Sequence, residues 1–135
     1  MLDASAALAF SLPSQANPAV DAFFARTPLP SLRAPGVFRI EARNALLRFE
    51  RIGAIVAAHA DAAWSLIAAM VTLAPLGEID AGFDGVIALA RAERLSFFDA
   101  CDLDMAIREA ASLASLDKAL LTAAQRRGIA VEDLR

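Results

Sequence analysis

Short apolar runs alternate along this chain with longer stretches in which apolar residues recur every three or four positions. The short runs are typical of buried strands, and the longer stretches are typical of amphipathic helices. Strands that alternate with helices indicate an α/β domain. Because the 135 residues contain no repeat, low-complexity tract or linker, we predict that residues 1–135 form a single domain.

The predicted elements follow from apolar periodicity, from prolines and from capping residues. Strands are expected at residues 1–4, 32–34, 70–73, 113–116 and 129–131. Helices are expected at residues 6–10, 18–26, 37–52, 54–69, 80–93, 96–110 and 117–127, with a break at residues 27–30.

The composition indicates a folded protein without a membrane span. With 58% hydrophobic and 21% charged residues, the chain is not of the disordered class. The most apolar window, residues 52–76, is interrupted by His59, Asp61 and Pro75, whereas a membrane helix needs about 20 mostly apolar residues. No secretory signal is visible, and the single cysteine, Cys101, cannot form an intrachain disulfide, so we expect a cytoplasmic protein.

The charge pattern limits how the chain can approach nucleic acid. A net charge of −3 counts against a protein that coats RNA by neutralising phosphates, but it does not count against an enzyme that reaches phosphate through metal ions. The positive residues are twelve arginines and Lys118. Arginine suits bidentate contacts to phosphate or carboxylate, although a base-composition bias in the coding DNA gives the same excess.

Three acids lie at positions where sites form in α/β proteins. Asp3 ends the first predicted strand, Asp117 follows the strand at residues 113–116, and Asp99 lies in the first turn of a predicted helix. Sites in parallel sheets lie beyond the carboxyl ends of the strands, and helix N-termini favour negative charge. Acids at such places are also common helix caps, so position alone leaves capping and metal binding both open.

Four short motifs occur in order and together span the chain. They are residues 2–9 (LDASAALA), 41–47 (EARNALL), 95–100 (LSFFDA) and 113–117 (LASLD). The motifs resemble the opening strand and turn, the Glu-x-x-Asn-x-Leu helix, the Leu-Ser-x-Tyr-Asp-Ala segment and the closing Leu-Ala-Thr-x-Asp strand of PIN-domain ribonucleases of the VapC toxin type.

This resemblance implies a three-layer α/β/α PIN-like domain with a central parallel sheet and an acidic pocket. In that family the pocket binds Mg²⁺ or Mn²⁺ and hydrolyses RNA phosphodiesters, typically of transfer or ribosomal RNA, with a metal-activated water. Cleavage would leave a 5′-phosphate and a 3′-hydroxyl. The expected partners are the RNA substrate and a cognate antitoxin. The apolar composition of the chain favours a homodimer.

The resemblance also assigns residues. The catalytic and metal-binding acids are Asp3, Glu41, Asp99 and Asp117. The supporting residues are Ser5, Asn44 and Ser115. Apart from the resemblance, substrate contact needs local positive charge, and Arg43 and Arg48 on the predicted Glu41 helix are the candidate substrate-binding residues. They are equally well explained as partners of surface acids such as Glu50. Asp102 departs from the pattern, because the family usually has a large residue such as Tyr there. It shares a helix face with Asp99 at a spacing of three, so it is either a fifth acid or a solvent-exposed substitution.

Two other functions are compatible with the sequence. A PIN-fold interaction module that no longer cuts RNA would keep the fold without the activity, and a housekeeping RNA-processing nuclease would keep the chemistry without an antitoxin. The chemistry needs no histidine, so we predict that His59 is a surface or packed residue. Cys101 is expected to be a buried small apolar residue.

Overall fold

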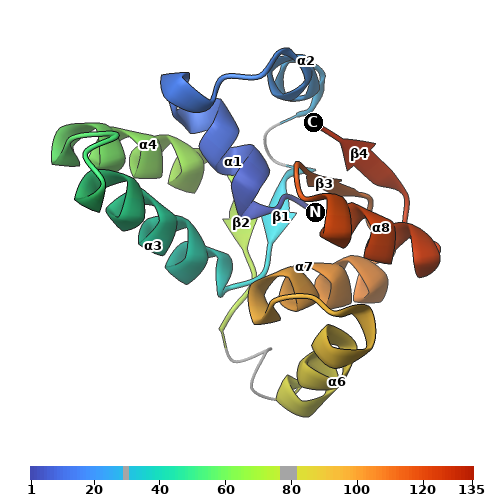
Figure 1. Cartoon of the computed structure of the whole chain (residues 1–135). Helices are drawn as coiled ribbons and strands as arrows, with labels where there is room; N and C mark the ends of the chain where they lie inside the picture. Colours follow the sequence, from blue (N-terminus) through green and yellow to red (C-terminus); the bar gives the residue numbers. More distant parts are fainter. Residues whose placement is uncertain (29–30, 77–81) are drawn as a thin grey trace.

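The computed structural model of the chain describes residues 1–28, 31–76 and 82–135 (Figure 1). The first half contains α1 (Ala4–Ser11), the 3₁₀ helix η1 (Pro13–Gln15), α2 (Pro18–Arg26), β1 (Arg33–Ala34), α3 (Phe38–Arg51) and α4 (Ala57–Met70). The second half contains β2 (Thr72–Leu73), α6 (Phe83–Glu93), α7 (Phe97–Arg108), β3 (Leu113–Ser115), α8 (Lys118–Arg126) and β4 (Val131–Asp133).

The predicted three-layer α/β/α fold with a central parallel sheet is wrong, because the described residues are mostly helical. Their strands are two or three residues long and form two separate two-stranded parallel sheets, β1 with β2 and β3 with β4. Prolines explain part of this shortness. Pro35 follows β1 directly and Pro75 lies two residues after β2, and a proline has no N–H to donate to a further ladder bond.

The predicted helices are confirmed. Within the described ranges, their observed ends differ from the predicted ends by at most three residues. The helix predicted at residues 80–93 is observed from Phe83, and residues 80–81 lie outside the described residues, as do residues 29–30 of the predicted break. The strand predicted at residues 1–4 is reduced to one parallel bridge between Leu2 and Ala114. α4 begins later than predicted because the chain turns after Gly53, whose φ of +73° is readily adopted by glycine.

The N-terminal segment is held between the two small sheets by backbone hydrogen bonds. The N–H of Leu2 donates to the carbonyl of Arg33 in β1 over 2.8 Å, and the N–H of Asp3 donates to the carbonyl of Ala114 in β3 over 3.1 Å. The N–H of Ala114 donates in turn to the carbonyl of Met1 over 2.9 Å. These bonds attach the segment that ends at Asp3 to β1 and to β3 before α1 begins.

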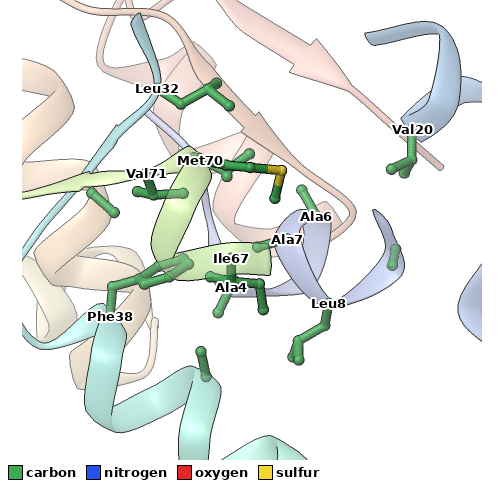
Figure 2. Close-up of a cluster of buried hydrophobic side chains, with 14 of the residues drawn as sticks. Ala4, Ala6, Ala7, Leu8, Val20, Leu32, Phe38, Ile67, Met70 and Val71 are labelled. Atoms are coloured by element: carbon green, nitrogen blue, oxygen red, sulfur yellow. The ribbon is translucent and has the colours of Figure 1, made fainter. Parts of the chain in front are cut away.

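The main core lies where α1 packs against α3 and α4 (Figure 2). Ala6 and Ala7 of α1 are fully buried, and their small side chains let the neighbouring helices approach closely. Phe38 of α3 and Ile67 of α4 fill the space beside them. A second cluster joins α7, α8 and β3. Over the described ranges, no helix combines the length and apolar character that a membrane crossing requires.

Candidate metal centre

Three carboxylates from distant parts of the chain meet beside the start of α1. Asp3 is the N-cap residue of α1, Glu41 lies in the first turn of α3, and Asp102 lies in the second turn of α7. One carboxylate oxygen from each lies within 4.8 Å of the others. Asp3 and Asp102 are buried, with 3% and 1% of their surface exposed, while Glu41 is partly open to solvent. The cluster therefore has a buried floor and one acid near its rim.

Asp3 is oriented by two hydroxyl groups. Ser115 at the end of β3 donates to Asp3 Oδ2 over 2.6 Å, and Ser5 in α1 donates to the same oxygen. The N-cap backbone of Asp3 starts α1, but its side chain makes no capping hydrogen bond, so the carboxylate is not directed at the helix end. Burial raises the pKa of Asp3, the two hydroxyl groups lower it, and the charge of Asp99 raises it.

Burial and neighbouring carboxylates also disfavour the charged forms of Glu41 and Asp102. Burial, followed by the charges of Asp3 and Asp99, raises the pKa of Glu41 from 4.5 to about 8. Burial and the charges of Asp3, Glu41 and Asp99 raise the pKa of Asp102 well above its ordinary value, and the Met1 ammonium group lowers it. In the described part of the chain, one buried side-chain polar atom has no hydrogen-bond partner, and that atom is Asp102 Oδ1.

No arginine or lysine neutralises this cluster within the ranges that the structure describes. The ion pairs found there lie elsewhere, for example between Arg33 and Glu109 and between Arg108 and Asp104. Among the described residues, the positive charge that lowers the pKa of Asp102 is the Met1 ammonium group, which donates to the carbonyl of Ser112 over 2.5 Å. The acids thus form a largely buried site without a paired basic side chain among the described residues.

The two remaining predicted acids lie at helix starts. Asp99 forms a capping box with Ser96, whose hydroxyl accepts from the Asp99 N–H over 3.1 Å and donates to Asp99 Oδ2 over 2.6 Å. Asp99 lies near enough to raise the pKa of the clustered acids without being one of the three. Asp117 is exposed, and its Oδ1 accepts the N–H of Leu120 over 2.9 Å as the N-cap of α8. Its role as a ligand stays a prediction.

The predicted supporting residues differ in what they contact. Ser5 and Ser115 both contact Asp3, and they also order the chain around it, since Ser5 Oγ accepts the N–H of Leu116 and Ser115 Oγ accepts the N–H of Asp117. Asn44 is exposed on α3. In the described part of the chain its side chain makes no hydrogen bond, so its supporting role stays a prediction.

The two candidate substrate-binding arginines lie on the exposed side of α3. The guanidinium group of Arg43 lies 5.2 Å from the centre of the Trp64 ring, a cation–π contact that holds the side chain at the surface. Arg48 lines a groove of about 410 Å³ between α1 and α3, whose other walls include Leu8 and Phe49. Ser5, whose hydroxyl donates to Asp3, also lines this groove.

His59 and Cys101 lie as expected. His59 is exposed on α4 and lines an apolar cavity of about 470 Å³ whose walls include none of the clustered acids. Cys101 is buried in α7, and burial, followed by nearby carboxylates, raises the pKa of its thiol to about 12. A thiol that stays protonated at neutral pH packs as a small apolar residue.

The cluster suits a hard divalent cation. Such ions prefer carboxylate oxygens, at about 2.0–2.1 Å for Mg²⁺, which brings the ligand oxygens to within about 4.2 Å of one another. The observed limit of 4.8 Å is close to this value, so small side-chain movements would close the three oxygens around an ion. Asp102 is the member that the motifs did not assign. The signal for it was an acid inside the apolar run of α7, between the buried Cys101 and Leu103.

No family model matches this chain, and no curated protein matches it. Among solved structures, the chain is similar to the crystal structure of PAE2754 from Pyrobaculum aerophilum, with a TM-score of 0.70 and 23% sequence identity. The match covers 96% of this chain and 87% of that chain. A likeness at this level of identity shows a common fold and carries no information about activity.

Proposed function

We propose that this protein is a metal-dependent endoribonuclease, of the toxin type that a cognate antitoxin restrains. The observation that carries the proposal is the convergence of the carboxylates of Asp3, Glu41 and Asp102 within 4.8 Å, without a basic side chain paired to them in the described residues. The four motifs resembling PIN-domain ribonucleases add support, since they select Asp3 and Glu41 independently of the geometry.

In this proposal the chain's residues hold and orient the reacting groups. Asp3, fixed by Ser5 and Ser115, and Glu41 hold Mg²⁺ or Mn²⁺, which supplies a water of lowered pKa and charge stabilisation for phosphodiester hydrolysis. Asp99, with one oxygen committed to Ser96, adds negative charge beside the site. No histidine is required, which agrees with the placement of His59 away from the acids.

The groove between α1 and α3 provides a path for the RNA backbone. Its lining includes Arg48 and Ser5, and the hydroxyl of Ser5 donates to Asp3. Arg48 is exposed and suits a phosphate contact, and Arg43 lies five residues earlier on the same helix. Because the whole chain is acidic, these local arginines have to supply the attraction to RNA.

The test is cleavage of single-stranded and structured RNA by the purified chain with Mn²⁺, with Mg²⁺, and with EDTA. We expect metal-dependent cleavage that leaves 5′-phosphate ends, and Asp3→Asn is expected to lower it at least about a hundredfold. The matched control is Asp21→Asn, an exposed acid in the first turn of α2, which should cleave like the wild type. Equal cleavage by Asp3→Asn and wild type, or cleavage undiminished in EDTA, would contradict the proposal.

The toxin assignment has its own test. A short open reading frame for a DNA-binding antitoxin that overlaps the start of this gene would separate a toxin from a housekeeping nuclease. Co-expression of that partner should suppress the cleavage activity, and lack of suppression would favour the housekeeping enzyme.

A further inference from the structure

Asp102 occupies an unusual place for an acidic residue. It lies on the inner side of α7, where its helix neighbours Ala100, Cys101, Leu103 and Met105 are all buried. Only 1% of its surface is exposed, which is less than for any of the other acids in or beside the cluster. A carboxylate is rarely buried to this extent unless an ion pair, hydrogen bonds or a metal ion compensate it.

The described structure gives Asp102 little such compensation. Its Oδ1 is buried without a hydrogen-bond partner, and the charges of Asp3, Glu41 and Asp99 surround it. The Met1 ammonium group is the one cation that acts on it among the described residues, and that group is already bonded to the carbonyl of Ser112. The neighbouring acid on the same helix shows the contrast, because Asp104 is paired with Arg108 over 2.8 Å.

We propose that Asp102 is a direct metal ligand, so that the ion is held by three carboxylates from the segment before α1, from α3 and from α7. The Asp102 carboxylate places one oxygen within 4.8 Å of the ligand oxygens of Asp3 and Glu41, and its Oδ1 is buried without a hydrogen-bond partner, so an ion bound to this carboxylate satisfies it. The ligand class is a hard divalent cation such as Mn²⁺ or Mg²⁺. This inference rests on the metal site of the proposed function, but not on RNA being the substrate.

A proton is the competing explanation for a buried acid, and the two can be distinguished. A protonated aspartic acid has one donor and one acceptor, and asparagine reproduces both its size and its ability to donate. If Asp102 were only protonated, Asp102→Asn would leave metal binding unchanged. If Asp102 is a ligand, the substitution removes one of three anionic oxygens from the ion.

Three anionic ligands on one small site also imply that the ion binds in the absence of RNA. The measurement is therefore a titration of the purified chain with Mn²⁺ alone, in which free Mn²⁺ is followed by electron paramagnetic resonance. We expect saturable binding of Mn²⁺ by the wild type. The affinity of Asp102→Asn should be weaker by about tenfold or more, because loss of even an outer-shell partner of a metal lowers the affinity about 10–100-fold. Asp104→Asn is the matched control, two residues away on the same helix, and should bind like the wild type.

Thermal unfolding keeps the test decisive if the asparagine variant folds poorly. Asp102→Leu replaces the buried carboxyl with an apolar group of the same branching, which removes the buried polar group, so the metal-free variant should melt at a higher temperature than the wild type. Addition of Mn²⁺ should raise the melting temperature of the wild type and of Asp104→Asn, but not that of Asp102→Leu.

The outcomes separate this inference from the proposed function. Wild-type affinity for Mn²⁺ in Asp102→Asn, or a full Mn²⁺ response in Asp102→Leu, would overturn the ligand role, whether or not RNA is cut. Absence of Mn²⁺ binding by the wild type would overturn it as well. Conversely, loss of Mn²⁺ binding in both variants supports the ligand role of Asp102, whether or not the wild type cleaves RNA. Failure of the wild type to cleave RNA would overturn the proposed nuclease activity alone.

Discussion

The acid cluster predicts that the metal-free protein becomes less stable as the pH rises, and Glu41 provides the clearest test. Its pKa is 4.5 in an unfolded chain and about 8 in the fold. Below pH 4.5 both states keep the proton, so Glu41 does not affect the equilibrium. Between pH 4.5 and 8 the unfolded chain releases a proton that the folded chain retains, which favours unfolding increasingly as the pH rises.

The size of the effect follows from the two pKa values. A difference of about 3.5, at about 1.36 kcal/mol for each pKa unit, sets an upper limit of about 4.8 kcal/mol by pH 8. Because the Glu41 carboxyl is partly open to solvent, which screens the charges around it, we expect about 2–3 kcal/mol in practice. Asp3 and Asp102 act in the same direction, since burial raises the pKa of both.

The assay is urea unfolding in EDTA at pH 5, 6, 7 and 8, with Glu41→Gln compared with the wild type. The variant has no proton to release at this position, so its stability should fall less between pH 5 and 8 by about 2–3 kcal/mol. Glu50→Gln, at the other end of α3 and outside the cluster, should follow the wild type. The Met1 amine opposes the trend near pH 8, because burial lowers its pKa, but this contribution cancels in the comparison of variants.

Two results would refute this reasoning. Wild-type stability that is constant or rises from pH 5 to 8 without metal would mean that the acids carry no raised pKa. If the stability of Glu41→Gln fell with pH as steeply as that of the wild type, Glu41 would not be the group that causes the loss of stability. Saturating Mn²⁺ should restore most of the stability lost at pH 8, because the ion compensates the ionised carboxylates.

Three further predictions concern the fold. Gly36→Ala should destabilise the protein by about 1–3 kcal/mol in urea unfolding, because a Cβ there would lie 2.6 Å from the carbonyl oxygen of Ala74. Phe38→Ala, which empties a core position with 1% exposure, should cost about 3–5 kcal/mol in the same assay. Asp117→Asn should change stability by less than about 0.5 kcal/mol, since asparagine can accept the same N–H of Leu120 and caps helices as well as aspartate; a larger loss would assign the charge itself a structural role.

The helices could be predicted from the sequence because their signals are local. Pro18, for example, marks the first turn of α2, and Ser96 with Asp99 marks the start of α7 through a capping box. The sheet could not be predicted in the same way. Whether short apolar runs such as residues 32–34 and 70–73 join a larger sheet depends on hydrogen bonds between distant segments, and these pairs end after two residues.

The motifs predicted which positions of the sequence carry site residues. They did not predict which carboxylates lie close together in the fold. Asp102 shows the limit most clearly. A spacing of three from Asp99 places both acids on one helix face, yet the sequence leaves open whether that face points to solvent or inward. The packing of α7 against α6 and α8 decides the question, and it turns Asp102 inward beside Asp3 and Glu41.

Asp3 and Asp117 show why a motif does not separate a carboxylate of the acid cluster from a helix cap. Both are N-cap residues with extended backbone, and both follow a short apolar run. The side chain of Asp117 accepts the N–H of Leu120, so its carboxylate satisfies the start of α8. The side chain of Asp3 makes no such bond, because Ser115 and Ser5 donate to it instead and hold it in the buried cluster. The hydroxyl groups around an aspartate, rather than its place before a helix, therefore determine which of the two carboxylates lies in the acid cluster.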